Sequence, residues 1–332
     1  MHHTPFARSL APWLGATAIW FAAATAFAQP ASSAAGTSPP KRVTIGMYVN
    51  QIDNVSLKDS QVTVDFHIWF RWTDDDLKPI ETFDLVNGKI DTKEDVVTLS
   101  NDGYKYACCR VLATIHKLWN VSHFPLDAHD IAIAIEDGEY ESFKVEYVAD
   151  MANSGLNPEA EAAGWSLVPL GATVEPHEYN TNYGDISLPT GHASIYSRFV
   201  YSVGITRPGY GMFLKLFTGL FIAAAIAFHA LLIRPTELDA RFGLAVGAMF
   251  AAVASEYVVV SSLPDSNYLT LADKLHILTF GFVFLSLAVS VLSSKFANQG
   301  HENRSWWLDR LAFVGMSSAY TILVASAILI PY

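Results

Sequence analysis

The chain has 332 residues, of which 51% are hydrophobic and only 16% are charged, and its mean hydropathy is +0.26. This composition is too apolar for an ordinary soluble protein and too polar for one that lies wholly in a membrane, so it predicts two parts. The net charge is −11, and residues 29–207 hold 25 acidic against 13 basic side chains. An acidic surface of this kind excludes nucleic acid as a partner and attracts cations.

The first 28 residues have the pattern of a secretory signal peptide. Arg8 supplies a positive charge, an apolar stretch follows, and Ala26-Phe27-Ala28 resembles a cleavage site. We expect residues 1–28 to be removed, the alternative being an uncleaved membrane anchor. Residues 29–42 are rich in Pro and Ser and are expected to form a flexible leader.

Residues 43–207 predict an antiparallel β-sandwich. Short stretches with alternating hydrophobicity recur, and turn-forming residues separate them. The predicted strands are 43–49, 62–72, 105–115, 130–137, 143–149, 165–175 and 197–207. Cys108 and Cys109 are the only cysteines, and neighbours in a strand point to opposite faces, so no disulfide is expected.

Motifs for catalysis, metal binding or phosphate binding do not occur in the sequence, and an enzyme is the least supported class. We expect no cofactor and no metal. His123 and His129 have no metal-ligand spacing and are predicted to be surface histidines. The acidic run at 73–76 could hold a divalent cation, although such runs are more often only solvated.

Four later segments are apolar and long enough to cross a bilayer, which requires about 20 residues. They are 211–233, 240–263, 271–293 and 307–331, so residues 208–332 predict a four-helix transmembrane domain. The connections after the first and third segments carry Arg234, Arg241, Lys295 and Arg304, whereas residues 264–270 contain no Lys or Arg. The positive-inside rule therefore predicts that the sandwich lies outside the cytoplasm.

Several motifs follow one another in the order found in a known family. The stretch "LWNVSHFPLDAHDI" (118–131) contains an aromatic residue, Pro, an apolar residue and Asp. Lys117 stands just before it and Ile131 is its last residue. "SRFVYSVGITRP" places Arg207 just before the first span, and "SSLPDSNYLTLADKL" joins the second span to the third. Together they resemble the pentameric ligand-gated ion channels, or Cys-loop receptor superfamily. Lys117 and Ile131 stand where animal members have the loop cysteines, as in the prokaryotic branch.

The resemblance covers most of residues 43–332 and implies a homopentamer in the bacterial inner membrane. It implies a periplasmic sandwich domain and a central pore for monovalent cations, opened by an unknown small ligand or by protons. Two features depart from the family pattern. The Trp-x-Pro stretch that forms one wall of the usual agonist pocket is missing between Trp72 and Phe124, and the first span lacks a mid-helix proline.

The second span combines apolar and polar residues in a helical pattern. Steps of three and four residues place seven side chains on one stripe, namely Asp239, Gly243, Gly247, Phe250, Ala254, Tyr257 and Ser261. An acid, small residues, an aromatic and a hydroxyl suit a water-filled pore better than lipid. Asp239 is expected to form an acidic ring that favours cations, Phe250 a gate that closes by dewetting, and Tyr257 an upper constriction. Alternatively, Gly243 and Gly247 form a small-xxx-small packing motif.

Other acids and aromatics are candidates for sensing a ligand or protons. Glu256 lies beside the stripe and is either a hydrogen-bonded buried acid or a proton-sensitive group. The turn "EDGEYE" (136–141) stands where the resemblance places a binding loop, although a solvated hairpin is equally expected. The remaining candidates are Glu139, Tyr140, Glu141, Tyr179 and Tyr183.

The resemblance also implies a gating interface formed by Asp59, Asp127, Arg207 and Pro264. A guanidinium can hydrogen-bond two carboxylates at once, so Arg207 is expected to hold both aspartates. The alternative is three unrelated surface charges.

The sequence thus favours a ligand- or proton-gated, cation-selective channel. The rival is a non-conducting membrane-anchored receptor, in which the exported domain binds a ligand and signals to another protein.

Overall fold

The structure is a computed structural model that describes residues 39–186, 188–189 and 191–330. The predicted signal peptide and residues 29–38 of the predicted leader lie outside the described residues. The last two leader residues belong to the first strand, which begins at Lys41.

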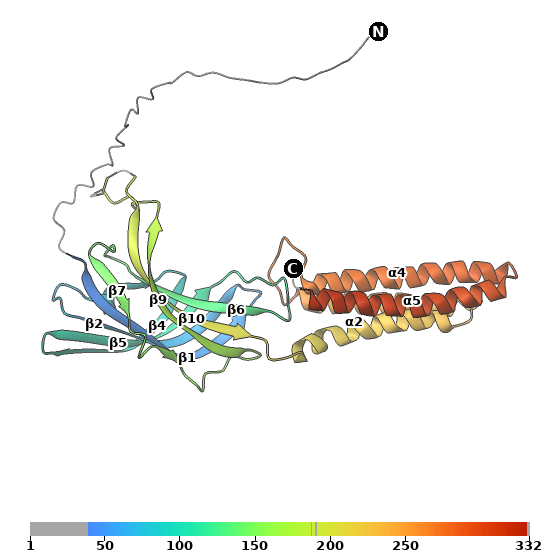
Figure 1. Cartoon of the computed structure of the whole chain (residues 1–332), viewed down its shortest axis with the longest axis horizontal. Helices are drawn as coiled ribbons and strands as arrows, with labels where there is room; N and C mark the ends of the chain where they lie inside the picture. Colours follow the sequence, from blue (N-terminus) through green and yellow to red (C-terminus); the bar gives the residue numbers. More distant parts are fainter. Residues whose placement is uncertain (1–38, 187, 190, 331–332) are drawn as a thin grey trace, which may run out of the picture. The chain divides into compact units, whose positions relative to one another are not determined.

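Two β-sheets make up the part of the chain before the helices (Figure 1). The first sheet contains β1 (Lys41–Ser56), β2 (Gln61–Trp72), β4 (Gly88–Asn101), β5 (Tyr104–His116), β7 (Val145–Ala149) and β8 (Gly155–Leu156). Its order is β4-β5-β2-β1-β7, and β8 also pairs with β1. The second sheet has the order β3-β6-β10-β9 and contains β3 (Phe83–Leu85), β6 (Ala128–Asp137), β9 (Ser166–Tyr179) and β10 (Ser194–Thr206). The single turn α1 (Pro79–Thr82) precedes β3.

Alternating side chains of the two sheets build one hydrophobic core. Val64, Phe66 and Ile68 of β2 are fully buried, as the alternation in the sequence predicts. Phe199 and Val203 of β10 belong to the same buried cluster. The predicted β-sandwich-like domain is therefore present.

The sheets differ from the prediction in two respects. The strands β7 and β8 run in the same direction as β1 and pair with it in parallel. The first sheet is therefore mixed. The sequence also gives no sign of β4, whose side chains are almost all exposed. As an edge strand with Lys, Glu and Asp on both faces, β4 lacks the alternation by which a half-buried strand is recognised.

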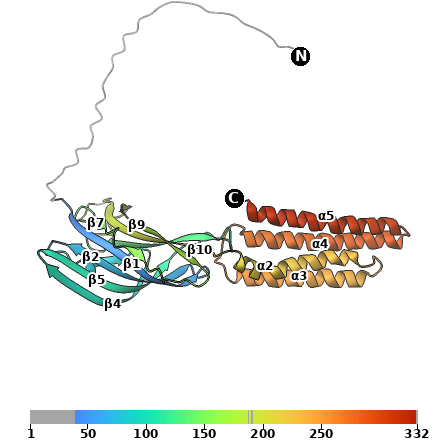
Figure 2. The same cartoon turned by 60° about the horizontal axis from the view of Figure 1, so that its bottom comes forward.

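Four helices follow the sheets, and each is long and apolar enough to cross a membrane. They are α2 (Gly211–His229), continued by the 3₁₀ turn η1 (Ala230–Leu232), α3 (Leu238–Val260), α4 (Leu271–Asn298) and α5 (Glu302–Leu329). Contacts join α2 to α3, α3 to α4 and α4 to α5, and Figure 2 shows the four helices side by side. The start of α5 lies five residues before its predicted position, because apolarity marks the membrane-spanning length and not a polar first turn.

The helices are buried to very different extents within the single chain. About 39% of the most apolar window of α2 and of α4 is buried, but only 22% for α3 and 6% for α5. The helix α3 therefore exposes most of its surface when the chain stands alone. The function of α3 therefore depends on the side chains that lie on this exposed surface.

Candidate functional site

The seven stripe residues, here called the polar stripe, all lie on the exposed side of α3. Phe250 is 71% exposed and Tyr257 77% exposed, and the other five are exposed as well. The residues that α3 buries lie on its opposite face, namely Arg241, Ala245, Ala248, Ala252 and Val259. The helical period explains this division, because residues two apart, such as Asp239 and Arg241, lie about 200° apart around the axis.

Two apolar strips separate the polar stripe from the buried face of α3. One contains Leu244 and Val258, the other Val246 and Val253, and these four side chains are 38–55% exposed. A side chain added at Gly243 or Gly247 would meet no atom within 4 Å. Within the single chain these glycines therefore do not form the close packing that the alternative interpretation requires, and only a contact with another chain could use them in that way.

Glu256 lies half-buried at the border of the buried face. The neighbouring Ser255 hydroxyl lies 3.3 Å from Nε2 of His276 on α4 and 3.5 Å from the Leu216 carbonyl oxygen on α2. Among the described residues, no hydrogen bond reaches the Glu256 side chain. The hydrogen-bonded acid that one interpretation of Glu256 expects is thus not formed in the described part of the chain.

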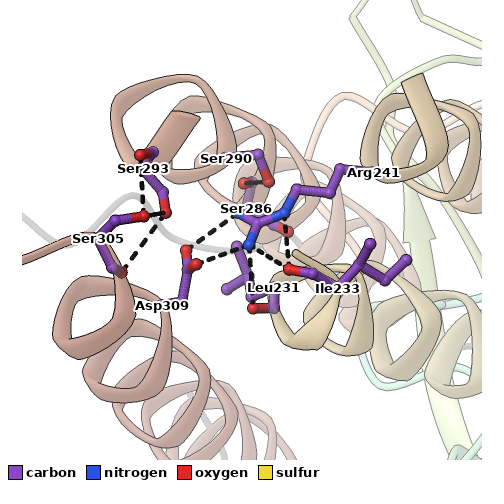
Figure 3. Close-up of polar contacts among 8 residues, drawn as sticks. All are labelled: Leu231, Ile233, Arg241, Ser286, Ser290, Ser293, Ser305 and Asp309. Carbon is purple, nitrogen blue, oxygen red and sulfur yellow. Dashed lines mark hydrogen bonds and ion pairs between the residues drawn. The ribbon is translucent and has the colours of Figure 1, made fainter. Parts of the chain in front are cut away.

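Arg241 and Asp309 form a buried ion pair between α3 and α5 (Figure 3). Arg241 Nη1 donates to Asp309 Oδ1 over 3.0 Å and Nη2 donates to Oδ2 over 2.6 Å. Arg241 Nε also donates to the Ile233 carbonyl at 3.1 Å. The sequence counted Arg241 among the charges of a connection, but the structure places it inside the bundle. Its partner lies 68 residues away, so no local pattern could reveal the pair.

Behind this pair, serines continue a buried polar seam along α4 (Figure 3). Ser293 and Ser305 share a hydrogen bond of 2.7 Å between their hydroxyls, and Ser286 donates to the Ala227 carbonyl at 2.6 Å. Among helices in lipid, such hydrogen bonds contribute more to helix register than apolar contacts, because lipid is as apolar as a leucine side chain. The seam therefore fixes how α5 and α2 lie against α4.

Asp127, His129, Trp165 and Arg207 form a second group, the junction cluster. Arg207 Nε lies 3.5 Å from Asp127 Oδ1, and His129 Nε2 lies 2.7 Å from Asp127 Oδ2. The Arg207 guanidinium stacks on the Trp165 ring at 3.5 Å and donates to the Gly164 carbonyl at 3.3 Å. Burial lowers the pKa of Arg207, and the Asp127 carboxylate opposes that shift.

The junction cluster corrects two predictions. Asp59 is exposed, accepts a hydrogen bond from the Ser56 hydroxyl at 2.7 Å, and forms no ion pair with Arg207 in the described part of the chain. The three-residue cluster thus forms only in part. His129 is not a surface histidine, because it lies on the inward face of β6, with its ring at 5.0 Å from Trp119 and 5.7 Å from Trp165.

The loop that carries the "FPLD" motif is hydrogen-bonded to the connection between α3 and α4. The Val121 N–H donates to the Tyr268 hydroxyl at 3.1 Å, and the Leu271 N–H donates to the Ser122 carbonyl at 2.8 Å. Pro264 lies half-buried in the same connection. The sequence did not single out Tyr268, because nothing in its local pattern distinguishes an anchoring hydroxyl from an exposed one.

A third group, the tyrosine cluster, consists of His177, Tyr179, Tyr183 and Tyr196 at the β9–β10 hairpin. The Tyr179 ring lies 4.6, 5.6 and 5.9 Å from the rings of His177, Tyr183 and Tyr196. Beneath it, Arg198 pairs with Glu136 at 2.6 Å, and the Tyr179 hydroxyl bridges both side chains. Burial and the Glu136 carboxylate raise the pKa of Tyr179.

The sequence found Tyr179 and Tyr183, and Glu136 as an acid of the "EDGEYE" turn, but it missed Arg198 and the ion pair that joins Arg198 to Glu136. An acid that ends the apolar run "IAIAIED" and a single Arg in "SRFVYSV" are the signals that could have found the pair. A buried charge in an apolar strand needs a partner of opposite charge.

The "EDGEYE" turn beside the tyrosine cluster is more structural than solvated. Asp137 Oδ1 accepts from the backbone N–H groups of Glu139 and Tyr140, each at 2.9 Å. The Lys144 ammonium lies 3.6 Å from the Tyr140 ring centroid, and Glu141 lies 3.2 Å from His192. Of the six predicted candidates, Glu139 and Tyr183 are exposed and the other four are half-buried.

The acidic run at 73–76 is paired with lysines. Lys41 lies 2.7 Å from Asp74 and 3.7 Å from Asp76, and Lys105 pairs with Asp75. Among the residues that the structure describes, no group of three or more His, Cys, Asp or Glu side chains could hold a metal ion. The divalent-cation interpretation of this run thus gains no support.

The architecture, with two β-sheets followed by four apolar helices, is compatible with that of the pentameric ligand-gated channels. Comparison with protein-family models and with curated proteins finds no match to this chain.

Proposed function

We propose that the chain forms a homopentameric, cation-selective channel of the bacterial inner membrane, opened by a small ligand or by protons. The observation that carries this proposal is the division of the α3 surface into a buried face, two apolar strips and a polar stripe. The sandwich domain lies in the periplasm in this proposal, as the distribution of Lys and Arg predicts.

The α3 surface requires both water and further protein. A carboxylate such as Asp239 is costly against hydrocarbon, so the polar stripe needs a wet environment. The apolar strips on either side need apolar neighbours. A closed ring of identical chains supplies both, with α3 lining the axis and its strips facing the helices of adjacent copies. The number five comes from the resemblance alone.

Asp239 would determine the sign of the permeating ion. Arg241 lies close to it in the sequence, but the buried Asp309 neutralises the Arg241 charge away from the stripe. The exposed Asp239 carboxylates would therefore set the field at that mouth of the pore, and a ring of carboxylates favours cations. Further along the stripe, Phe250 would close the pore by dewetting, because Gly243 and Gly247 leave no side chain to narrow it.

The tyrosine cluster is the candidate place for the stimulus. Aromatic faces attract cations, and the exposed Glu139 would add negative charge beside them. These features suit a small amine, while protons and divalent cations remain alternatives for the stimulus. The hydrogen bonds that Val121 donates to Tyr268 and that Ser122 accepts from Leu271 would carry the change to α3.

Recording from the purified protein in a planar bilayer tests the proposal. We expect unitary currents that reverse near the cation equilibrium potential in a salt gradient, and that appear on addition of a small amine or on a pH drop. An oligomer that binds a ligand at the tyrosine cluster but never conducts would favour the non-conducting receptor. Reversal at the chloride potential would contradict cation selectivity alone.

A further inference from the structure

A cavity of about 650 Å³ lies on the second sheet, on the face turned away from the hydrophobic core and beside the end of β10. The loop after β5, the first residues of β6 and β9, and the last residues of β10 form its wall. The wall includes two charged side chains, one amide and three apolar side chains, namely Lys117, Asp130, Asn120, Leu118, Val168 and Leu170. None of these six residues belongs to the polar stripe, the junction cluster or the tyrosine cluster.

A glycine in the central strand makes room for this cavity. Gly204 of β10 pairs with Asp130 of β6 on one side and with Val168 of β9 on the other. Side chains directly opposite each other on neighbouring strands normally touch, so a strand position without a side chain leaves a gap between its two neighbours. A Cβ atom added at Gly204 would meet the Leu170 side chain at 3.6 Å, an ordinary contact. Crowding therefore does not require the glycine, and a larger side chain would fill the cavity.

Two opposite charges line the cavity without pairing with each other. Lys117 is half-buried, and its ammonium lies 5.5 Å from the centre of the Trp119 ring. In the part of the chain that the structure describes, neither this ammonium nor the exposed Asp130 carboxylate forms an ion pair or a side-chain hydrogen bond. Burial lowers the pKa of Lys117, and the nearby Asp130 carboxylate opposes that shift. The cavity thus offers a cation and an anion, each able to bind a group of opposite charge.

The apolar part of the wall is open to water. Leu118 is 92% exposed, and Val168 and Leu170 are 49% and 54% exposed. A single exposed apolar side chain is common on a protein surface, but apolar side chains gathered in a concave site with a few polar groups are typical of a small-molecule site. A ligand that covers this wall needs an apolar group beside its charges.

We propose that this cavity binds a free amino acid with an apolar side chain, in its zwitterionic form. The ligand carboxylate pairs with Lys117 and accepts a hydrogen bond from the NH₂ group of Asn120, whose side-chain oxygen is held by the Ser122 N–H at 3.1 Å. The ligand ammonium pairs with Asp130, and the apolar side chain lies in the gap above Gly204. A simple amine has no group for the lysine, and a simple carboxylate has none for the aspartate, so both bind more weakly.

Occupancy of this cavity bears on the junction cluster. His129 contributes to the wall, and Thr206, another wall residue, directly precedes Arg207. A bound amino acid therefore stabilises one arrangement of the strand ends that hold Asp127 and Arg207. This regulatory part rests on the proposed channel function, whereas the amino-acid site itself does not.

The test is isothermal titration calorimetry of the purified full chain in detergent, with leucine as the probe. Leucinamide, which lacks the carboxylate, and 4-methylpentanoate, which lacks the ammonium, are titrated in parallel. We expect leucine to bind and each analogue to bind about tenfold more weakly, because each loses one charge-assisted contact. Lys117→Gln should remove the preference for leucine over leucinamide, and Asp130→Asn should remove the preference over 4-methylpentanoate.

Two matched controls and one further variant complete the experiment. Lys58→Gln and Asp102→Asn each remove an exposed charge from a turn outside the cavity, so leucine should bind to both as it binds to the unaltered protein. Gly204→Val fills the gap without changing the charge and should weaken the binding of all three ligands.

Four results would overturn the site. These are no binding of leucine to the unaltered protein, equal affinity for the three ligands, equal weakening by Lys58→Gln and Lys117→Gln, or unchanged binding by Gly204→Val. Tyr179→Ala is a further arm, and if it abolishes leucine binding that Lys117→Gln retains, the amino acid binds at the tyrosine cluster instead. No current is measured, so failure here leaves the channel proposal intact.

Discussion

Arg207 gathers three different contacts on a single guanidinium group: an ion pair with Asp127, a stack on Trp165 and a hydrogen bond to Gly164. Its side chain is only 10% exposed, so water cannot replace these contacts. Because Asp127 also contacts His129, the carboxylate keeps one partner when Arg207 is removed.

Arg207→Ala should therefore strongly destabilise the protein and, in the proposed channel, abolish gating. Loss of one member of a buried pair costs about 3–5 kcal/mol, and His129 keeps the loss near the lower value. Thermal unfolding and size-exclusion chromatography in detergent measure the effect. Lys58→Ala removes an exposed charge from the turn between β1 and β2 and should change the unfolding temperature very little. A stable Arg207→Ala protein with normal currents would show that the domains are coupled elsewhere.

Asp239→Asn should weaken discrimination against chloride and lower the conductance, because it removes the carboxylate ring in the proposed channel. The measurement is the reversal potential in a salt gradient. Glu237→Gln removes the same charge from an exposed position just before α3, off the polar stripe, and should leave the reversal potential unchanged. An unchanged potential for Asp239→Asn would exclude this residue as the filter.

Asp65 should make the stability of the sandwich sensitive to acid. A hydrogen bond from Arg110, 3.0 Å from Nε to Oδ1, lowers the pKa of Asp65 in the folded protein. A lowered carboxyl pKa contributes stability above about pH 4, which is lost as the pH falls through the folded value. Asp65→Asn should reduce the slope of the unfolding temperature against pH in this acidic range. Asp102→Asn, at an exposed turn, should retain the slope; equal flattening by both would refute the assignment to Asp65.

At the scale of the elements, a side-chain capping box begins α4. The Thr270 hydroxyl accepts from the Asp273 N–H at 3.1 Å, and Asp273 Oδ2 accepts from the Thr270 N–H at 2.8 Å. The same turn holds Leu271, whose N–H reaches the Ser122 carbonyl. The box therefore supports both the helix and its contact with the "FPLD" loop.

Thr270→Ala should cost about 1 kcal/mol of stability, because it removes one half of the box. We expect a lower unfolding temperature and, in the proposed channel, a higher stimulus concentration for half-maximal opening. Thr218→Ala is the control, since Thr218 is exposed on α2 and its hydroxyl bonds only the preceding turn. If the two variants unfold at the same temperature, the box contributes nothing to stability.

The elements that the sequence predicts are those with a clear period. The side chains of β2 alternate between buried and partly exposed positions, the four spans are long and apolar, and the polar stripe follows the helical repeat. Each of these features can be recognised from the sequence alone. The strand β4 is exposed on both faces and has no period. The pairs Arg241–Asp309 and Arg198–Glu136 join distant parts of the chain, so only the fold brings them together.

At the scale of the whole molecule, the single chain leaves extensive apolar surface on its spanning helices. The two apolar strips of α3 are exposed, and only 6% of the most apolar window of α5 is buried. Lipid can cover α5, whose exposed side chains include Ile322, Leu323 and Leu329. It cannot cover α3 without also covering Asp239. This division of the α3 surface supports the proposed ring of identical chains.

Phe250→Ala should produce a channel that leaks without stimulus, because a smaller side chain lets water fill the proposed constriction. Resting conductance in the bilayer measures the effect. Met249→Ala removes a side chain of similar size from the adjacent, partly buried position and should leave the resting conductance low. A tightly closed Phe250→Ala channel would move the gate to another stripe residue, Tyr257 being the next candidate.

The pair between Arg241 and Asp309 also has a consequence for biosynthesis. The ribosome makes Arg241 before Asp309, with α4 between them. While α5 is still being made, the Arg241 guanidinium enters the membrane domain with only carbonyl partners, such as that of Ile233. A cation without its counter-charge is unfavourable there, so the arrival of α5 completes the charge balance of the domain. A chain interrupted between α4 and α5 would therefore carry an uncompensated charge that a membrane quality-control protease can recognise.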